Sequence, residues 1–220
     1  ISETELWSCT TCGACMQECP VLIEHVPTII DMRRHLVLSE GKPPMQANES
    51  LEKTMLNGNP WGFPKEDRLK WTESTDFKPP TLQEKNEVDI LYWVGCAGSY
   101  DPRNQSIATS MLKILESADI DYAVLGKEET CTGDSARRLG EEYLFETLAK
   151  QNVKTLNKYK FNKIVTACPH CMNTILNEYP DFGGEYEVVH HTELIDELLA
   201  TGKLKTMNKY DKKITFHDPC

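Results

Sequence analysis

The sequence predicts an α/β protein in which a small helical domain precedes a cysteine-rich α/β domain with a mostly parallel sheet. From about residue 87 onward, short apolar runs alternate with segments of helical periodicity, which is typical of βαβ units. The N-terminal stretch instead holds four closely spaced cysteines and one helix-like segment. With 220 residues, of which 40% are hydrophobic, the chain has the material for one medium domain and a small one.

Composition divides the chain into three stretches. Residues 1–38 are expected to form the small domain, with a helix over 27–38. Residues 39–86 are rich in proline and glycine, so they are predicted to be a linker or an extended wrap. Their aromatic residues are expected to pin this stretch to a domain surface or to dock a partner. These residues are Trp61, Phe63 and Trp71. Residues 87–220 form the predicted α/β domain.

The predicted strands of that domain are short apolar runs, and each of the first four precedes a predicted helix. The strands are expected over residues 88–94, 122–125, 161–167, 187–189 and 213–216. The helices are expected over 106–118, over 134–159 (continuous or broken), after Cys171 and over 192–200, with Thr192 as the N-cap of the last helix. Residues 89–96 and 213–220 resemble each other, and each run ends a strand with a cysteine, where α/β folds bind ligands.

Composition also limits the function. A net charge of −10 without a basic block argues against nucleic acid as a partner. No apolar run approaches the roughly 20 residues of a membrane span. Nine cysteines, an odd number without an export signal, argue against disulfides and for metal or redox chemistry in the cytoplasm. The chain begins at Ile1 and stops at Cys220 inside a motif, so we expect a fragment whose other parts could reach the inner face of the cell membrane.

Four cysteines near the N-terminus follow the spacing C-x2-C-x2-C-x3-C-P, which is the bacterial ferredoxin run for a 4Fe–4S cluster. They are Cys9, Cys12, Cys15 and Cys19. Two-residue spacers let the backbone curl around a cube, and Gly13 permits a positive φ in that curl. A zinc knuckle is the alternative, although zinc motifs usually separate two C-x2-C pairs by a longer loop. Cys19 either completes this cluster or serves a second one whose motif lies upstream.

A second set of cysteines lies at strand ends and turns of the predicted α/β domain. It consists of Cys96, Cys131, Cys168 and Cys171, with 34, 36 and 2 residues between successive members. Because they belong to one α/β unit, we expect the four thiolates to converge on one point. Cys168-Pro-His-Cys171 has an alternative interpretation as a thioredoxin-like dithiol, since a helix N-terminus lowers the pKa of a thiol placed there.

The second set resembles the cysteine-rich (CCG) domain of heterodisulfide reductase-related iron–sulfur proteins, whose pattern is Cys, a long gap, Cys-Cys-Gly, a similar gap and C-x-x-C. The pattern maps onto Cys96, Cys131-Thr132-Gly133 and Cys168-Pro-His-Cys171, and His217-Asp-Pro-Cys220 resembles the opening of a second copy. With the ferredoxin run in front, the order resembles D-type heterodisulfide reductase subunits. It also resembles the iron–sulfur subunits of glycolate oxidase and of anaerobic glycerol-3-phosphate dehydrogenase, and the iron–sulfur oxidoreductases linked to electron-transfer flavoprotein.

The resemblance implies an iron–sulfur oxidoreductase subunit that passes electrons between a flavoprotein dehydrogenase, or electron-transfer flavoprotein, and a quinone or disulfide acceptor. A membrane subunit is a further implied partner. The implied cofactors are 4Fe–4S clusters. Their implied ligands are Cys9, Cys12, Cys15, Cys19, Cys96, Cys131, Cys168, Cys171 and Cys220. Because Thr132 replaces the second cysteine of the Cys-Cys-Gly pattern, a non-cubane cluster is expected only in the incomplete second copy. No catalytic residue is assigned.

Several smaller features keep two interpretations each. His190 and His191 are either metal ligands or an ordinary pair at a strand end. Arg137 and Arg138 either offset cluster charge and steer an acidic partner, or form local ion pairs on a solvated helix face. Trp7 either shields a cluster from water or simply packs. From outside redox chemistry, a zinc-binding structural module is the alternative for the whole chain.

Overall fold

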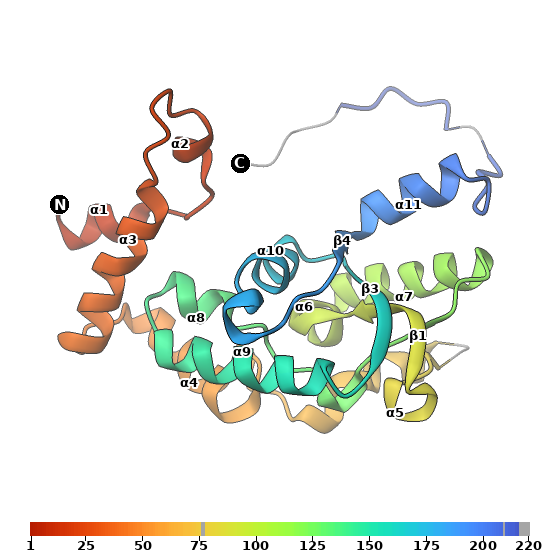
Figure 1. Cartoon of the computed structure of the whole chain (residues 1–220), viewed down its shortest axis with the longest axis horizontal. Coiled ribbons are helices and arrows are strands. Elements are labelled where there is room, and N and C mark those ends of the chain that lie inside the picture. Colours follow the sequence, from red (N-terminus) through yellow and green to blue (C-terminus); the bar gives the residue numbers. More distant parts are fainter. Residues whose placement is uncertain (76–77, 209, 216–220) are drawn as a thin grey trace.

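A four-stranded, fully parallel sheet forms the centre of the protein (Figure 1). The computed structural model describes residues 1–75, 78–208 and 210–215. In the order β2-β1-β3-β4, the strands are β2 (Tyr122–Ala123), β1 (Glu87–Trp93), β3 (Lys160–Thr166) and β4 (Val188–His190). β1 pairs with β3 from Glu87 opposite Lys160 to Trp93 opposite Thr166. The predicted α/β class with a mostly parallel sheet is confirmed.

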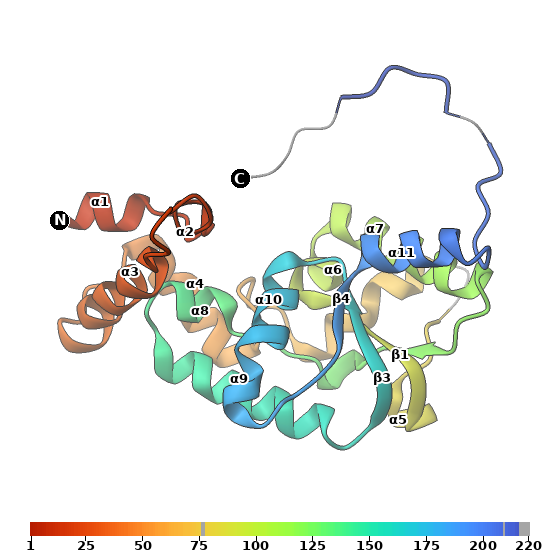
Figure 2. The ribbon, with the colours of Figure 1, turned by 45° about the horizontal axis from the view of Figure 1, so that its top comes forward.

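Helices cover both faces of the sheet, as Figures 1 and 2 show. The helices are α7 (Pro102–Ser117) and α11 (His191–Ala200) on one face and α9 (Glu142–Leu156) and α10 (Pro169–Asn177) on the other. Successive side chains of a strand point to opposite faces. Ile90 and Tyr92 of β1 therefore pack into the apolar cluster of α7 and α11, and Leu91 and Trp93 into that of α9 and α10. Burial on both faces explains the nearly continuous apolar run of β1.

The N-terminal residues fold into helices that lie beside the sheet rather than on it (Figure 1, red and orange). They are α1 (Glu3–Ser8), α2 (Ala14–Gln17) and α3 (His25–Arg34), continued by the π-helical turn η1 (His35–Ser39). Ser2 and Glu5 form a reciprocal capping box at the start of α1. The helix predicted over 27–38 is confirmed as α3 and η1.

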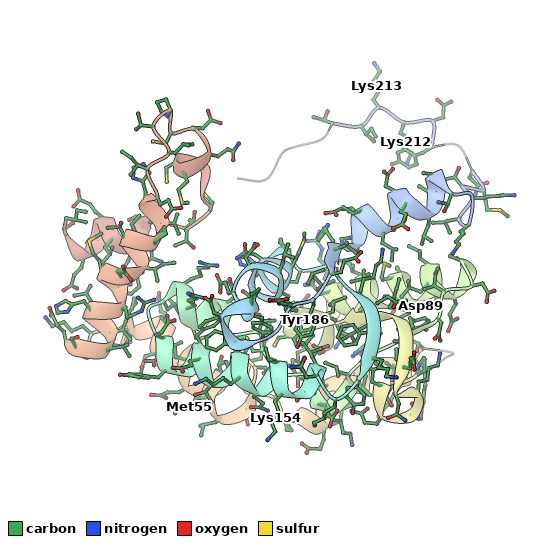
Figure 3. The ribbon with its side chains drawn as sticks, viewed as in Figure 1. Met55, Asp89, Lys154, Tyr186, Lys212 and Lys213 are labelled. Carbon is green, nitrogen blue, oxygen red and sulfur yellow. The ribbon has the colours of Figure 1, made fainter. Side chains whose placement is uncertain are left out.

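Residues 39–86 hold more regular structure than the predicted linker or wrap. They contain α4 (Met45–Asn57), the 3-10 helix η2 (Lys65–Ser74) and α5 (Leu82–Lys85). The prolines and glycines that suggested irregular chain instead mark helix ends: Pro44 is the N-cap of α4, and Gly58 ends it with a φ of +67°. Leu51 faces the core, whereas Met55 is 65% exposed and lies at the outer edge of the molecule in Figure 3.

The aromatic side chains of this stretch attach it to the α/β domain. Trp71 is buried in the apolar cluster of β1 and α7. Trp61 and Phe63 are partly exposed, and their ring centroids lie 6.5 and 5.3 Å from that of Tyr100. They pin residues 39–86 to a domain surface, as one of the two interpretations expected.

The helix predicted over 134–159 takes the broken form that the prediction allowed: it is two helices, α8 (Asp134–Arg138) and α9, which are separated by Gly140 with a φ of +84°. Two other elements differ from their predictions. His190 is the N-cap of α11, so Thr192 lies inside the first turn and does not cap it. The strand predicted over 213–216 does not form at residues 213–215, because no described strand pairs with them, and residues 216–220 lie outside the described part. The remaining elements are α6 (Gly95–Tyr100), η3 (Gly126–Glu128) and η4 (Tyr179–Phe182).

Candidate functional site

The second cysteine set comes from the carboxyl ends of three neighbouring strands. Cys96 lies in the first turn of α6 after β1, and Cys131 lies in the loop between β2 and α8. Cys168 and Cys171 follow β3, as the N-cap and an early residue of α10. Because β1 sits between β2 and β3, the three strand ends share one edge of the sheet.

Contacts among the thiols bring these four cysteines together. The side chains of Cys96 and Cys131 interact, which lowers the pKa of Cys96 and raises that of Cys131. Cys168 and Cys171 form a second such pair, and the raised pKa of Cys171 reflects its interaction with Cys168, burial and the charges of the other three cysteines. A Cβ on Gly95 would lie 3.6 Å from Sγ of Cys171, so the residue before Cys96 lies beside the second pair. Their role as cluster ligands stays a prediction.

Backbone N–H groups point at these sulfurs. The N–H of Gly133, the N-cap of α8, donates to Sγ of Cys131 at 3.4 Å. The thiol of Cys171 lowers the pKa of Cys168 to about 6, with help from the backbone N–H groups of Cys171 and His170 in the first turn of α10. Donors and helix N-termini of this kind stabilise thiolates, which are the species that bind metals.

A buried ion pair that sequence reasoning missed also reaches the site. Arg68 of η2 and Glu129 are 2% and 1% exposed, and Nη1 of Arg68 donates to Oε1 of Glu129 at 2.5 Å. Nη2 of Arg68 donates to Sγ of Cys96 at 3.3 Å. No local signal marks this pair, because its members lie 61 residues apart and outside every cysteine motif.

Thr132 points at the same site from the position of the missing family cysteine. It is 2% exposed, and its hydroxyl donates to Sγ of Cys171 at 3.8 Å. Its carbonyl accepts a hydrogen bond from the hydroxyl of Tyr179 at 3.1 Å. This bond holds the loop that carries Cys131 and Thr132 in place. The site therefore offers four thiols and one neutral hydroxyl.

The ferredoxin run curls around α2. Cys12 and Cys15 are exposed, and Cys9 and Cys19 are half-buried. Gly13 has the expected positive φ, at +79°, and is the N-cap of α2. The N–H groups of Thr11 and Ile23 donate to Sγ of Cys9 and Cys19 at 3.4 and 3.3 Å. These N–H···S bonds suit thiolates that ligate an iron–sulfur cluster.

The donor sets differ in how well they suit the two candidate metals. In the described residues, no three side chains among His, Cys, Asp and Glu lie close enough together to hold a single metal ion. Zinc would need its thiolates about 2.3 Å from one centre. An iron–sulfur cluster is larger, because bridging sulfides separate its irons, and its thiolates stay farther apart. The eight free thiols among the described residues, several of which accept N–H donors, fit the cluster better than zinc.

The smaller features take their structural interpretations. Arg138 forms ion pairs with Asp134, at 3.2 Å, and with Glu178. The rings of His190 and His191 meet edge to face with centroids 4.3 Å apart, and no third metal donor joins them in the described chain. These contacts support local ion pairing and an ordinary strand-end pair.

Arg33 joins the two cysteine regions. It is 4% exposed and donates to the carbonyl oxygens of Cys9 at 2.5 Å and Leu6 at 2.8 Å in the N-terminal region. Its other terminal nitrogen donates to the carbonyl oxygen of Arg138, at the end of α8, at 2.9 Å. Its Cζ lies 5.0 Å from the centroid of Trp7, so Trp7 packs on this bridge.

One cleft of about 990 Å³ lies between the ferredoxin run and the first turns of α8 and α10. Thr11 and Cys12 of the ferredoxin run form part of its wall. Asp134 and His170, hydrogen-bonded to each other at 2.9 Å, line it from the side of the α/β domain. The two regions thus face each other across a shared space.

Comparison with known proteins identifies the α/β part. The model of the family described as "Cysteine-rich domain" (CCG) matches residues 90–176, a span that includes Cys96, Cys131, Cys168 and Cys171. This part of the chain is therefore similar to CCG domains. The matched span includes most of β1, all of β2 and β3, and the strand ends that carry the four cysteines.

Relatives match the chain over nearly all its length. It is 47% identical to "Probable iron-sulfur-binding oxidoreductase FadF" of Bacillus subtilis and 41% identical to "EtfAB:quinone oxidoreductase" of Syntrophomonas wolfei, each over 100% of this chain. It is 31% identical, over 99% of this chain, to the D-type subunit of the dihydromethanophenazine:CoB--CoM heterodisulfide reductase of Methanosarcina barkeri. The chain spans 32%, 31% and 53% of these three proteins, respectively. The resemblance to heterodisulfide reductase-related iron–sulfur oxidoreductases is confirmed, and no solved structure matches.

One more relative bears on the membrane. The chain is 42% identical, over its full length, to "Probable membrane-anchored ferredoxin" of Chromohalobacter salexigens, of which it covers 33%. Within the part of this chain that the structure describes, no helix is both long enough and apolar enough to cross a membrane.

Proposed function

We propose that this chain is the electron-transfer part of an iron–sulfur oxidoreductase. The observation that carries the proposal is the meeting of Cys96, Cys131, Cys168 and Cys171 at three adjacent strand ends. The ferredoxin run, Cys9 to Cys19, supplies a second site on the other side of the shared cleft. We assign residues 1–38 to the ferredoxin-like domain, 39–86 to the connecting stretch and 87–220 to the cysteine-rich domain.

Clusters at these sites, when bound, take up and release single electrons. The chain supplies thiolates as ligands, N–H groups that stabilise their negative charge, and burial that shields the CCG site from water. Arg33 fixes the ferredoxin run against α8, so both sites keep a constant separation.

The cluster type follows from the donors. Four thiolates match the four irons of a cube, and the Thr132 hydroxyl stays protonated at neutral pH and is a poor iron ligand. We therefore propose 4Fe–4S clusters at both sites, and a non-cubane cluster only in a second CCG copy that Cys220 would open. Cys19 serves either the first cluster or one outside this chain.

The partners are proposed from the relatives. One of them is named for EtfAB and quinone, and another for a heterodisulfide. We propose that electrons pass between a flavoprotein, such as a dehydrogenase or electron-transfer flavoprotein, and a quinone or disulfide acceptor. The location that suits these partners is the cytoplasm, with any membrane attachment made by parts outside this chain.

Metal analysis of the anaerobically purified full-length protein tests the proposal. We expect a brown protein with iron and acid-labile sulfide in equal amounts. A colourless protein that contains zinc, or no metal, would contradict it.

One observation favours a second candidate, a dithiol oxidoreductase that uses Cys168 and Cys171. The pKa of Cys168 is lowered to about 6, and helix N-termini activate such thiols. This candidate leaves Cys96, Cys131 and the ferredoxin run without a role. It predicts a colourless protein in which oxidation links Cys168 to Cys171, a bond that mass spectrometry would detect.

A further inference from the structure

We propose that Arg68 is a positioning residue for the CCG site, where its guanidinium holds the Cys96 thiolate and raises the reduction potential of the bound cluster. The inference rests on the proposed function and deepens it, because it concerns the same site. Arg68 lies in the stretch expected to be a linker, so the inference also gives that stretch a part in the site.

The Arg68 side chain is held from three directions. Nη2 donates to Sγ of Cys96 at 3.3 Å, and Nη1 donates to Glu129 at 2.5 Å. Its Cζ lies 5.5 Å from the centroid of the Tyr100 ring. With only 2% of the side chain exposed, the guanidinium is confined to one orientation, with one edge at the thiol.

Glu129 ties this arginine to the backbone that carries Cys96. Its two carboxylate oxygens accept hydrogen bonds from the N–H groups of Val94, at 3.0 Å, and Gly95, at 2.8 Å. These are the two residues immediately before Cys96. A change in the position of Arg68 is therefore transmitted to the thiol through its own bond and through the backbone.

Stability alone does not explain this pair. Removing two charges from water is costly, and well-packed apolar residues often serve a fold as well as a buried ion pair. In addition, Nε of Arg68 is buried and has no hydrogen-bond partner among the described residues. A spare buried donor beside a thiol is what the sulfides of a cluster would accept.

The electrostatic consequence has a definite sign. Reduction adds an electron, so the reduced cluster is the more negative state and gains more from a neighbouring positive charge. The guanidinium stays charged at all relevant pH values and therefore raises the reduction potential. Glu129 lies behind the guanidinium and opposes part of this effect.

Potentiometric titration of the full-length protein, followed by electron paramagnetic resonance, tests the proposal. Glu129→Gln should raise the potential of the CCG cluster, and Arg68→Gln should lower it. The double variant, in which residues 68 and 129 are both uncharged, should have a reduction potential between those of Arg68→Gln and the wild type. We expect Arg68→Gln to change the reduction equilibrium at least tenfold, which is about 59 mV for a one-electron couple.

Two further variants make the result decisive. Arg68→Lys keeps the buried charge and should therefore keep most of the wild-type potential; if Arg68→Gln does not fold, the rise expected in Glu129→Gln still tests the inference. Arg103→Met removes an exposed charge from α7 and should leave the potential unchanged. Unchanged potentials in Arg68→Gln and Glu129→Gln, with iron retained, would overturn this inference and leave the proposed function standing. A wild-type protein without iron at this site would overturn both.

Discussion

Thr132 is the residue at which this chain departs from the CCG cysteine pattern. Its hydroxyl lies 3.8 Å from Sγ of Cys171 and is buried with it. The departure therefore changes the donors of the site itself rather than a distant loop. The replacement of a thiolate by this hydroxyl is the reason why we expect a 4Fe–4S cluster, and not a non-cubane cluster, at this site.

A cysteine at this position should add a fifth thiolate to the site. We predict that Thr132→Cys changes the paramagnetic resonance spectrum of the CCG cluster while iron stays bound. Thr130→Cys is the matched control, because Thr130 is equally buried but directs its hydroxyl to Asn152, at 2.9 Å. A Thr132→Cys spectrum identical to that of the control would show that position 132 does not reach the cluster.

At the scale of single residues, the cysteines could be predicted from the sequence and their partners could not. Close spacing indicated the ferredoxin run, because ligation of one cluster favours short intervals. The position of the other four cysteines at predicted strand ends, together with the family resemblance, indicated the second set. Arg68 and Glu129 carry no such interval: they meet only after η2 packs on the sheet. Cys220 lies outside the described residues, so its role stays a prediction.

Among the helices and their caps, the glycine that follows Cys131-Thr132 is required both by packing and by its positive φ. Gly133 has a φ of +91°, and a Cβ there would lie 2.8 Å from Cδ2 of Phe145 on α9. Its N–H donates to the Cys131 thiol. Any side chain would push α8 away from α9 and would move that donor.

We predict that Gly133→Ala lowers the free energy of unfolding by about 1–3 kcal/mol from the clash, plus the strain of a left-handed alanine. Gly183→Ala is the control: its φ is +78° but a Cβ there meets nothing within 4 Å, so strain alone applies, about 1 kcal/mol. Chemical denaturation under anaerobic conditions measures both. Equal losses in the two variants would contradict the packing role.

The strands were readable from the sequence because their apolar runs are buried on both faces. The helices of residues 39–86 were not, since Pro44 and Gly58 suggest irregular chain when they in fact bound α4. The pairing of strands could not be predicted from the sequence either: residues 213–215 have a strand-like composition, but no described strand lies beside them. The pattern of apolar residues therefore predicted the strands of the sheet better than it predicted the helices of residues 39–86 or the pairing of residues 213–215.

At the scale of the whole molecule, the N-terminal helices are attached through a narrow contact with the turn between α8 and α9. Gly140 lies there, and a Cβ on it would come within 2.5 Å of the backbone nitrogen of Arg34 and 2.6 Å of the carbonyl carbon of Arg33. Backbone cannot yield as a flexible side chain can. The separation of the two proposed clusters depends on this contact.

We predict that Gly140→Ala leaves both clusters bound but slows electron exchange between them, because α3 must move away from α8. Rapid-freeze paramagnetic resonance after mixing with reductant follows that exchange. Gly202→Ala is the control, since its φ is +73° and a Cβ there meets nothing. An exchange rate equal to that of the control would show that the contact does not set the separation.

We propose that the molecule holds two separate clusters, one at the ferredoxin run and one where three strand ends meet. The most direct measurement is the paramagnetic resonance spectrum of the reduced full-length protein, with iron counted, for Cys12→Ser and Cys131→Ser. Each variant serves as the control of the other. We expect Cys12→Ser to remove or alter one signal and Cys131→Ser to remove or alter the other, each with a loss of iron. An unchanged spectrum and iron content in Cys131→Ser would contradict it.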